Sequence, residues 1–182
     1  MREGKWIGAV FLAAMLSGSC VAGEVQFGFR YGGSNLNIDA DRMRNGDGVK
    51  SDGLSAGAAI GYRTDAGLLI ELGILGLLNV NSELLSGSVQ KSLGAGWQFD
   101  RGKWRLTPKA GLLHSYLDAA DGRNLLEDGR PSERFTDTVP FIEGMAEYRM
   151  FPRFGIGLFV RHAFEDFGDS QAWGVSFMWN ID

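Results

Sequence analysis

The chain has 182 residues, a formal net charge of −4 and a single cysteine. One cysteine allows no disulfide within the chain, and the acidic balance argues against a nucleic-acid partner. The most apolar stretch of the body, 68–78, is interrupted by Glu71 and two glycines, so no segment suits a transmembrane helix.

The first 22 residues are predicted to be a signal peptide. A short charged start precedes an apolar run at 6–16, and small residues follow that run. This order is typical of an export signal, and cleavage after Ala22 or after Gly23 fits equally well. The alternatives are an uncleaved N-terminal anchor and a lipoprotein acylated on Cys20. Cleavage removes this cysteine and leaves 23–182 as one domain.

Alternation of apolar with small or polar residues predicts eight strands in this domain. Phe27 and Phe29, for example, alternate with Gly28 and Arg30. A period of two places successive side chains on opposite faces of a strand. In chain order, the predicted strands are 24–35, 53–63, 68–78, 84–99, 104–116, 139–150, 154–164 and 170–181.

The connections between these strands alternate in length. Tight turns are expected at 64–67, 100–103 and 151–153, and the other connections are 36–52, 79–83, 117–138 and 165–169. Seven aromatic residues gather near the tight turns, as a membrane girdle would: Tyr62, Trp97, Phe99, Trp104, Tyr148, Phe154 and Trp179. The pattern predicts an all-β fold, an eight-stranded antiparallel up-and-down transmembrane β-barrel with an apolar outer face. A soluble β-sandwich is the alternative, but it leaves the shared height of the aromatics unexplained.

The last predicted strand carries Gly174, Phe177 and Trp179, a glycine followed by aromatics three and five positions later. With the strand pattern, this ending resembles the small eight-stranded outer-membrane β-barrel family, the OmpA-like transmembrane barrel domain. The resemblance covers nearly all of 23–182. It implies a place in the cell outer membrane and an assembly machinery that reads this strand. The chain departs from the family pattern at Ala172, where a polar residue is expected.

Parity turns many polar side chains toward the barrel interior. Those expected inside besides the central charges are Gln26, Arg63, Gln90, Gln98 and Arg105. Counting from the turns puts six charged residues at similar heights, namely Arg30, Glu71, Lys109, Glu143, Glu147 and Arg161. Glu143 and Arg161 lie equally far from the turn at 151–153 and are expected to face each other. Because buried charges must be paired, we expect a charged belt that plugs the lumen or, alternatively, gates small ions.

No catalytic or metal-binding constellation is evident. His114 and His162 are expected on the outer face, and the residues two positions later are aromatic rather than the serine that a lipid deacylase would need. The acidic segments 39–41 and 45–48 lack the spacing of a calcium-binding loop. We therefore predict no enzyme, no metal and no cofactor.

The longer loops are acidic, because 117–138 and 165–169 each carry a net charge of −3. Long loops on a rigid scaffold are common binding surfaces. We therefore expect a monomeric envelope barrel with a structural role and a surface-interaction role through these loops. The expected partners are outer-membrane lipid and lipopolysaccharide, the outer-membrane assembly machinery, and an extracellular ligand or host surface, but no nucleic acid. A narrow gated ion pore and a lipid-modifying enzyme are the alternatives.

Overall fold

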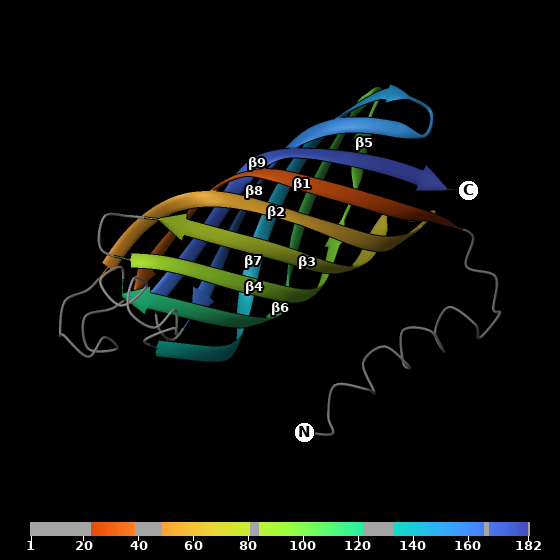
Figure 1. Ribbon diagram of the computed structural model, residues 1–182. Coiled ribbons are helices and arrows are strands. Elements are labelled where there is room, and N and C mark those ends of the chain that lie inside the picture. Colours follow the sequence, from red (N-terminus) through yellow and green to blue (C-terminus); the bar gives the residue numbers. More distant parts are fainter. Residues whose placement is uncertain (1–22, 39–48, 81–83, 122–132, 166–167, 182) are drawn as a thin grey trace.

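The computed structural model is a closed, all-antiparallel β-barrel (Figure 1). It describes residues 23–38, 49–80, 84–121, 133–165 and 168–181. The predicted signal peptide, 1–22, and the middle of the two longest predicted loops lie outside these described residues. Within them, no helix is long and apolar enough to cross a bilayer.

Nine strand segments make the eight strands of the barrel wall. They are β1 Gly23–Ile38, β2 Val49–Thr64, β3 Leu68–Val80, β4 Leu84–Trp97, β5 Phe99–Arg101, β6 Trp104–Asp121, β7 Glu133–Phe151, β8 Phe154–Glu165 and β9 Gly168–Ile181. The short β5 continues β4 past Gln98, and both pair with β6. The order is that of the chain, and β9 returns to pair with β1. The predicted fold class is therefore confirmed.

The strands reach further than expected on the side of the longer loops. β2 begins at Val49 rather than at 53, β6 continues to Asp121 rather than to 116, and β7 begins at Glu133 rather than at 139. The apolar alternation stops earlier than the strands do, but the backbone ladder continues because each strand still has a partner beside it. The predicted loops 36–52 and 117–138 are correspondingly too long. We call this side of the barrel the loop end and the other side the turn end.

The register of the pairs defines the tilt of the barrel. A path from Glu24 through successive partners crosses every strand in turn: Arg63, Leu69, Gly96, Lys109, Glu143, Arg161 and Ala172. It returns to β1 at Ser34, ten residues from where it began. Such a stagger accompanies a strand tilt of about 35–45° and an interior that side chains can fill.

Two tight turns at the turn end depend on glycine. Gly67 and Gly102 have φ values of +92° and +63°, in the left-handed region that side chains disfavour. Gly67 donates its N–H to the carbonyl of Thr64, which closes the turn between β2 and β3. These short connections are the ones that the sequence predicted.

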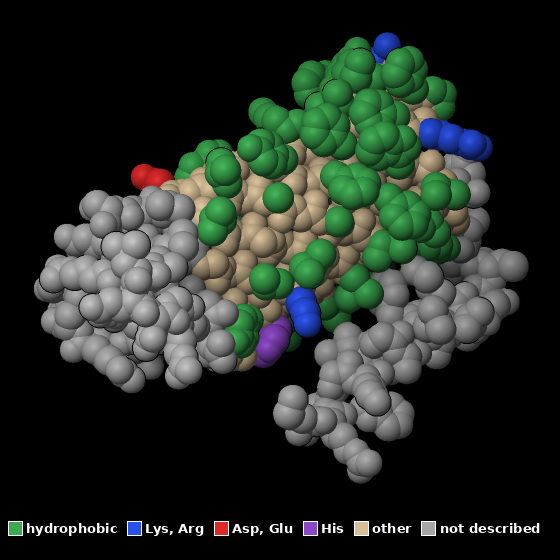
Figure 2. All heavy atoms as spheres, in the orientation of Figure 1, with side chains coloured by type: hydrophobic (Ala, Val, Ile, Leu, Met, Phe, Trp, Pro, Cys, Tyr) green, Lys and Arg blue, Asp and Glu red, His purple; other side chains and the backbone are tan. Residues whose placement is uncertain are grey.

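The outer wall is apolar. Leu158, Phe151 and Leu112 are exposed by 66%, 63% and 58%, which is unusual for a wall in water and suited to lipid. Figure 2 shows hydrophobic side chains distributed over the visible wall, most densely toward the turn end. At the turn end the expected aromatics meet across strands, with ring centroids 5.2 Å apart for Trp104 and Tyr148. The alternation therefore places the apolar side chains outside, as predicted.

Candidate functional site

The centre of the lumen is organised around Glu143 on β7. One of its carboxylate oxygens, Oε1, lies 2.6 Å from Lys109 Nζ and 3.2 Å from Arg30 Nη2. The other, Oε2, accepts a hydrogen bond from Arg161 Nε at 2.8 Å and lies 2.6 Å from Arg161 Nη2. Lys109, Glu143 and Arg161 are direct partners on neighbouring strands β6, β7 and β8, so the register itself brings them together.

Glu71 on β3 completes the cluster from another side of the lumen. It accepts hydrogen bonds from Arg30 at 2.7 Å and from Lys109 at 2.8 and 2.9 Å. Arg30 and Lys109 thus each contact both carboxylates and cross between strands that are not neighbours. All five side chains are exposed by 6% or less. We call Arg30, Glu71, Lys109, Glu143 and Arg161 the central belt; its formal charge is +1.

Glu147 is not part of this belt, contrary to the prediction. Its side chain faces the lumen and is fully buried, but it lies four residues nearer the turn end than Glu143, opposite Arg105 and Gly157 in the register. Neither of its carboxylate oxygens has a hydrogen-bond partner among the described residues. The error has a geometric cause, because tilted strands do not reach equal heights at equal counts from different turns.

A second ionic cluster lies at the turn end, outside the apolar band of the wall. Asp100 contacts Arg63 at 2.8 Å, Arg105 at 2.9 Å and Arg149 at 3.9 Å. Partial burial alone would raise the pKa of Asp100, but the hydrogen bond and positive charge of Arg105, with Arg63 and Arg149 nearby, hold it below its usual value. Glu24 joins the cluster through Arg63 at 3.3 Å and Arg105 at 3.2 Å.

A pair of amides spans the lumen between these two ionic clusters. Gln26 on β1 and Gln98, between β4 and β5, exchange hydrogen bonds of 3.1 and 2.8 Å. Both side chains are buried. Because β1 and β4 are separated by two other strands, this pair connects distant parts of the wall and obstructs the lumen near the turn end.

The loop half of the lumen is largely apolar, which the polar alternation did not predict. Two clusters of buried apolar side chains contribute to it. One holds Leu113, Val139, Phe141 and Ala163. The other begins there with Leu75, Leu77 and Ala172 and continues past the belt toward the turn end with Met145, Phe159 and Met178. They pack against the central belt, since the Arg161 guanidinium lies 4.7 Å from the centre of the Phe141 ring. Apolar side chains can point into the barrel because it is narrow enough to bury them.

A third polar cluster lies near the loop end. Gln90 donates hydrogen bonds to Glu165 and to Ser170, each at 2.8 Å, and the Ser170 hydroxyl donates to Glu165 at 2.8 Å. Glu165 was expected in an exposed acidic loop, but its side chain is buried in the lumen. Parity along β8 would have placed it inside, four residues beyond Arg161.

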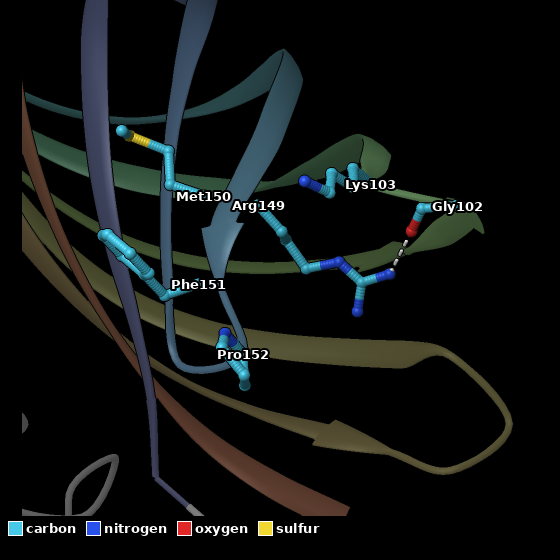
Figure 3. A pocket seen from close by; sticks show the side chains of 6 residues that line it. All are labelled: Gly102, Lys103, Arg149, Met150, Phe151 and Pro152. Carbon is cyan, nitrogen blue, oxygen red and sulfur yellow. Dashed lines mark hydrogen bonds between the residues drawn. The ribbon is translucent and has the colours of Figure 1, made fainter.

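Outside the lumen, a groove of about 260 Å³ lies between the two turns that follow β5 and β7. Figure 3 shows Arg149 reaching across it to donate a 2.6 Å hydrogen bond to the carbonyl of Gly102, with Lys103 close by. Met150, Phe151 and Pro152 line the other side. The groove thus combines basic and apolar side chains at the turn end.

The two histidines lie on the outer wall, as parity predicted. His114 Nδ1 is 2.9 Å from the Thr138 hydroxyl, and His162 Nε2 is 3.8 Å from Asp169. The His162 ring also packs edge-on against Phe164 at 4.4 Å. Among the described residues, no group of three or more histidine, cysteine or acidic side chains is arranged to hold a metal ion.

The residues of the predicted assembly signal lie at the seam where the barrel closes. Gly174 is paired with Gly32, and a Cβ on Gly174 would collide with the Tyr31 carbonyl oxygen. Phe177 is paired with Phe29, while the Trp179 ring lies 4.6 Å from Phe154. These residues therefore have a packing role in the closed barrel.

No protein-family model and no curated protein sequence matches the chain. Its fold is similar to solved structures that share little sequence with it. Neisserial surface protein A superposes with a TM-score of 0.70 at 11% identity, covering 86% of this chain and 97% of that chain. Ail, the attachment invasion locus protein of Yersinia pestis, gives 0.59 at 14% identity, covering 87% and 99%. The N-terminal β-barrel domain of Pseudomonas aeruginosa OprF gives 0.59 at 16%, covering 88% and 100%. The chain therefore shares the fold of these small eight-stranded β-barrels.

Proposed function

We propose that this protein is a monomeric outer-membrane barrel that serves a structural role in the envelope and presents its loop end to the exterior. The observation that carries this proposal is the filled lumen. Glu71 and Glu143 share three cations in the central belt, and all of these side chains are almost completely buried. A barrel that fills its own interior leaves the lipid-facing wall and the loops as its working surfaces.

The proposed orientation places the turn end in the periplasm and the loop end outside the cell. Short turns on the periplasmic side and longer extracellular loops are the rule for outer-membrane barrels. Export through the predicted signal peptide and assembly through the strand that carries Gly174, Phe177 and Trp179 belong to the same proposal.

Cysteine labelling tests this orientation directly, because the only cysteine of the sequence, Cys20, lies in the predicted signal peptide. Lys50→Cys places a thiol at the loop end of β2, and Arg101→Cys places one on the last residue of β5, beside the turn that follows it. A membrane-impermeant maleimide should label the first variant in intact cells and the second only after the outer membrane is permeabilised. The reverse pattern would refute the orientation.

Surface contact is the second part of the proposal. The loops 117–138 and 165–169 are acidic in sequence, and two proteins of similar fold are named for surface location and for attachment and invasion. We infer a binding role at the loop end toward an extracellular ligand or host surface. Replacing 123–131 by a glycine–serine linker should abolish adhesion of expressing cells while leaving the unfolding of the barrel unchanged. Unchanged adhesion would contradict the role.

A narrow gated pore is the second candidate, and one feature favours it. Arg30 and Lys109 each contact both Glu71 and Glu143, so ion pairs can exchange partners without movement of the wall. If the role is structural, the wild-type protein should show no channel openings in a planar bilayer, and Glu143→Gln should conduct no more than the wild type. Brief openings of the wild type that change in frequency in Glu143→Gln would favour the pore instead.

A further inference from the structure

One basic side chain stands on the apolar outer wall. Lys91 on β4 is the only lysine or arginine that the described strands place on this wall between the turn end and the loop end. Its neighbours on the same face are apolar and exposed: Val89 and Leu93 by 41%, and Ile74 by 48%. No ion pair within the described part of the chain involves Lys91. A cation on a lipid-facing wall is costly unless an anion accompanies it.

The strand register places two further polar residues beside Lys91. Lys91 is paired with His114 on β6, and His114 is paired with Thr138 on β7, so three neighbouring strands contribute one polar side chain each. Side chains opposite each other on paired strands are within reach of one another. Figure 2 shows a histidine and a basic side chain on the visible wall, bordered by hydrophobic side chains.

The contact between His114 and Thr138 fits an imidazole that accepts at Nδ1 and donates from Nε2. The Thr138 hydroxyl lies 2.9 Å from Nδ1 of the ring. When this hydroxyl donates to Nδ1, the ring hydrogen is on Nε2, which is then available to an external acceptor. In this tautomer, Lys91 Nζ and His114 Nε2 are two donors on the same face of the barrel, each with the chemistry to bind an anionic oxygen.

Lys91 lies within the apolar band of the wall, nearer to its loop-side boundary than to the turn end. Lys91 lies six positions along β4 from Trp97, which is among the aromatics of the turn end. With the rise of a tilted strand, this is about 15 Å along the barrel axis, in an apolar band about 25 Å tall. A lysine side chain adds roughly 6 Å, so the Lys91 ammonium can extend along the wall to within a few ångströms of the polar boundary, a gap that a hydrogen bond to a phosphate oxygen can span.

We propose that Lys91, His114 and Thr138 form a binding site for the phosphate group of a phosphorylated glycolipid in the outer leaflet. The leaflet assignment rests on the orientation proposed above. A phosphate supplies the anionic partner that Lys91 does not have among the described residues. It also has several oxygens that accept hydrogen bonds from Lys91 Nζ and His114 Nε2. A zwitterionic phospholipid is a weaker partner, because its own ammonium group already neutralises the phosphate.

Lipid retention on the purified barrel tests the site. The folded protein is extracted from phosphatidylcholine vesicles that contain bisphosphorylated lipid A or its dephosphorylated form, and bound lipid is counted by native mass spectrometry. The wild type should retain the phosphorylated form, and Lys91→Met should retain roughly tenfold less of it, as expected for loss of one charge-assisted contact. Lys103→Met removes an exposed lysine from the turn end and serves as the matched control, with retention like that of the wild type.

Three results would overturn the site. In the first, Lys91→Met retains as much phosphorylated lipid as the wild type. In the second, Lys91→Met and Lys103→Met lose the same amount. In the third, the wild type retains the phosphorylated and the dephosphorylated lipid equally. A concentration-dependent dimer that Lys91→Met dissolves would assign the wall to a second copy of the chain instead. Lys91→Arg should bind as the wild type does, and it remains informative if the methionine variant does not fold.

The labelling experiment on Lys50→Cys and Arg101→Cys separates this inference from the proposed function. Lipid retention from symmetric vesicles does not depend on orientation. Reversed labelling with intact retention would therefore refute the proposed topology and its leaflet assignment but leave the phosphate site in place. Correct labelling with no selective retention would refute the site alone.

Discussion

Glu143 and Arg161 meet through a single carboxylate oxygen. Both Nε and Nη2 of Arg161 approach Oε2 of Glu143, at 2.8 and 2.6 Å, while the other oxygen, Oε1, serves Lys109 and Arg30. The two partners therefore differ in the number of ion pairs they make. The Glu143 carboxylate contacts three cations, whereas Arg161 contacts only this one carboxylate in the described belt.

This inequality predicts unequal costs of mutation. Glu143→Gln leaves three buried cations with Glu71 alone and should lower the free energy of unfolding by about 3–5 kcal/mol. Arg161→Met leaves Glu143 paired with Lys109 and Arg30 and should cost less, roughly 1–3 kcal/mol. A double-mutant cycle by urea unfolding in lipid vesicles should give a coupling of about 0.5–3 kcal/mol. Additive losses would mean that the two side chains do not interact.

The outer wall should tolerate charge differently along its height. Leu158 and Phe151 are exposed to a similar extent, 66% and 63%, but Phe151 lies at the turn end. Arginine at 158 should cost roughly 2–4 kcal/mol of unfolding free energy, and arginine at 151 about 0–1 kcal/mol. Urea unfolding of both variants in the same vesicles measures the difference. Equal costs would contradict the placement of the apolar band.

The Asp100 cluster predicts a pH-dependent contribution to stability. The pKa of Asp100 is held below its unfolded value, so its contribution is present above about pH 4 and is lost as the pH falls through the lowered folded-state pKa. Because the carboxylate is only partly buried and solvent screens its ion pairs, the contribution should be about 1 kcal/mol or less. The stability difference between wild type and Asp100→Asn should therefore vanish in strong acid. A difference that grows as the pH falls would refute the assignment.

The closing seam should be sensitive to a single methyl group. An added Cβ at Gly174 would lie 2.5 Å from the Gly32 Cα and 2.8 Å from the Tyr31 carbonyl carbon, and both atoms are backbone. Gly174→Ala should cost roughly 1–3 kcal/mol of unfolding free energy and lower the folding yield. Gly87, where a Cβ meets nothing within 4 Å, provides the control. If Gly87→Ala is equally destabilising, the seam is not the cause.

The barrel could be predicted from the sequence because its two faces differ so strongly. Alternation along β1, β6 and β9 determined which side chains point inward, and the short turns determined the topology. Glu143 and Arg161 were paired correctly because they flank one turn and adjacent strands. Glu147 was placed wrongly because comparing heights between distant turns needs the tilt, which comes from the whole register and not from any one hairpin.

Other features of the interior carry too little local signal. Glu165 follows the predicted strand 154–164 and stands among acidic residues, so the sequence suggests an exposed loop position. Its place in the alternation of β8 nevertheless turns its side chain into the lumen, where it is buried. Phe141 and Phe159 are apolar side chains at inward positions, and nothing in a short segment distinguishes them from wall residues in a shifted register. The network that joins Lys109 to Glu71 depends on contacts across the lumen, which sequence spacing does not report.

Every pairing in the wall but one joins strands that follow each other along the chain; the remaining pairing sets Val25 beside Ile181. A chain that lacked β9 would leave β1 and β8 with unpaired N–H and C=O groups facing hydrocarbon, where each such group costs several kcal/mol. Partial barrels are therefore unstable in lipid, whichever strand is missing. Insertion of this protein should behave as an all-or-none event, completed when its last strand reaches its first.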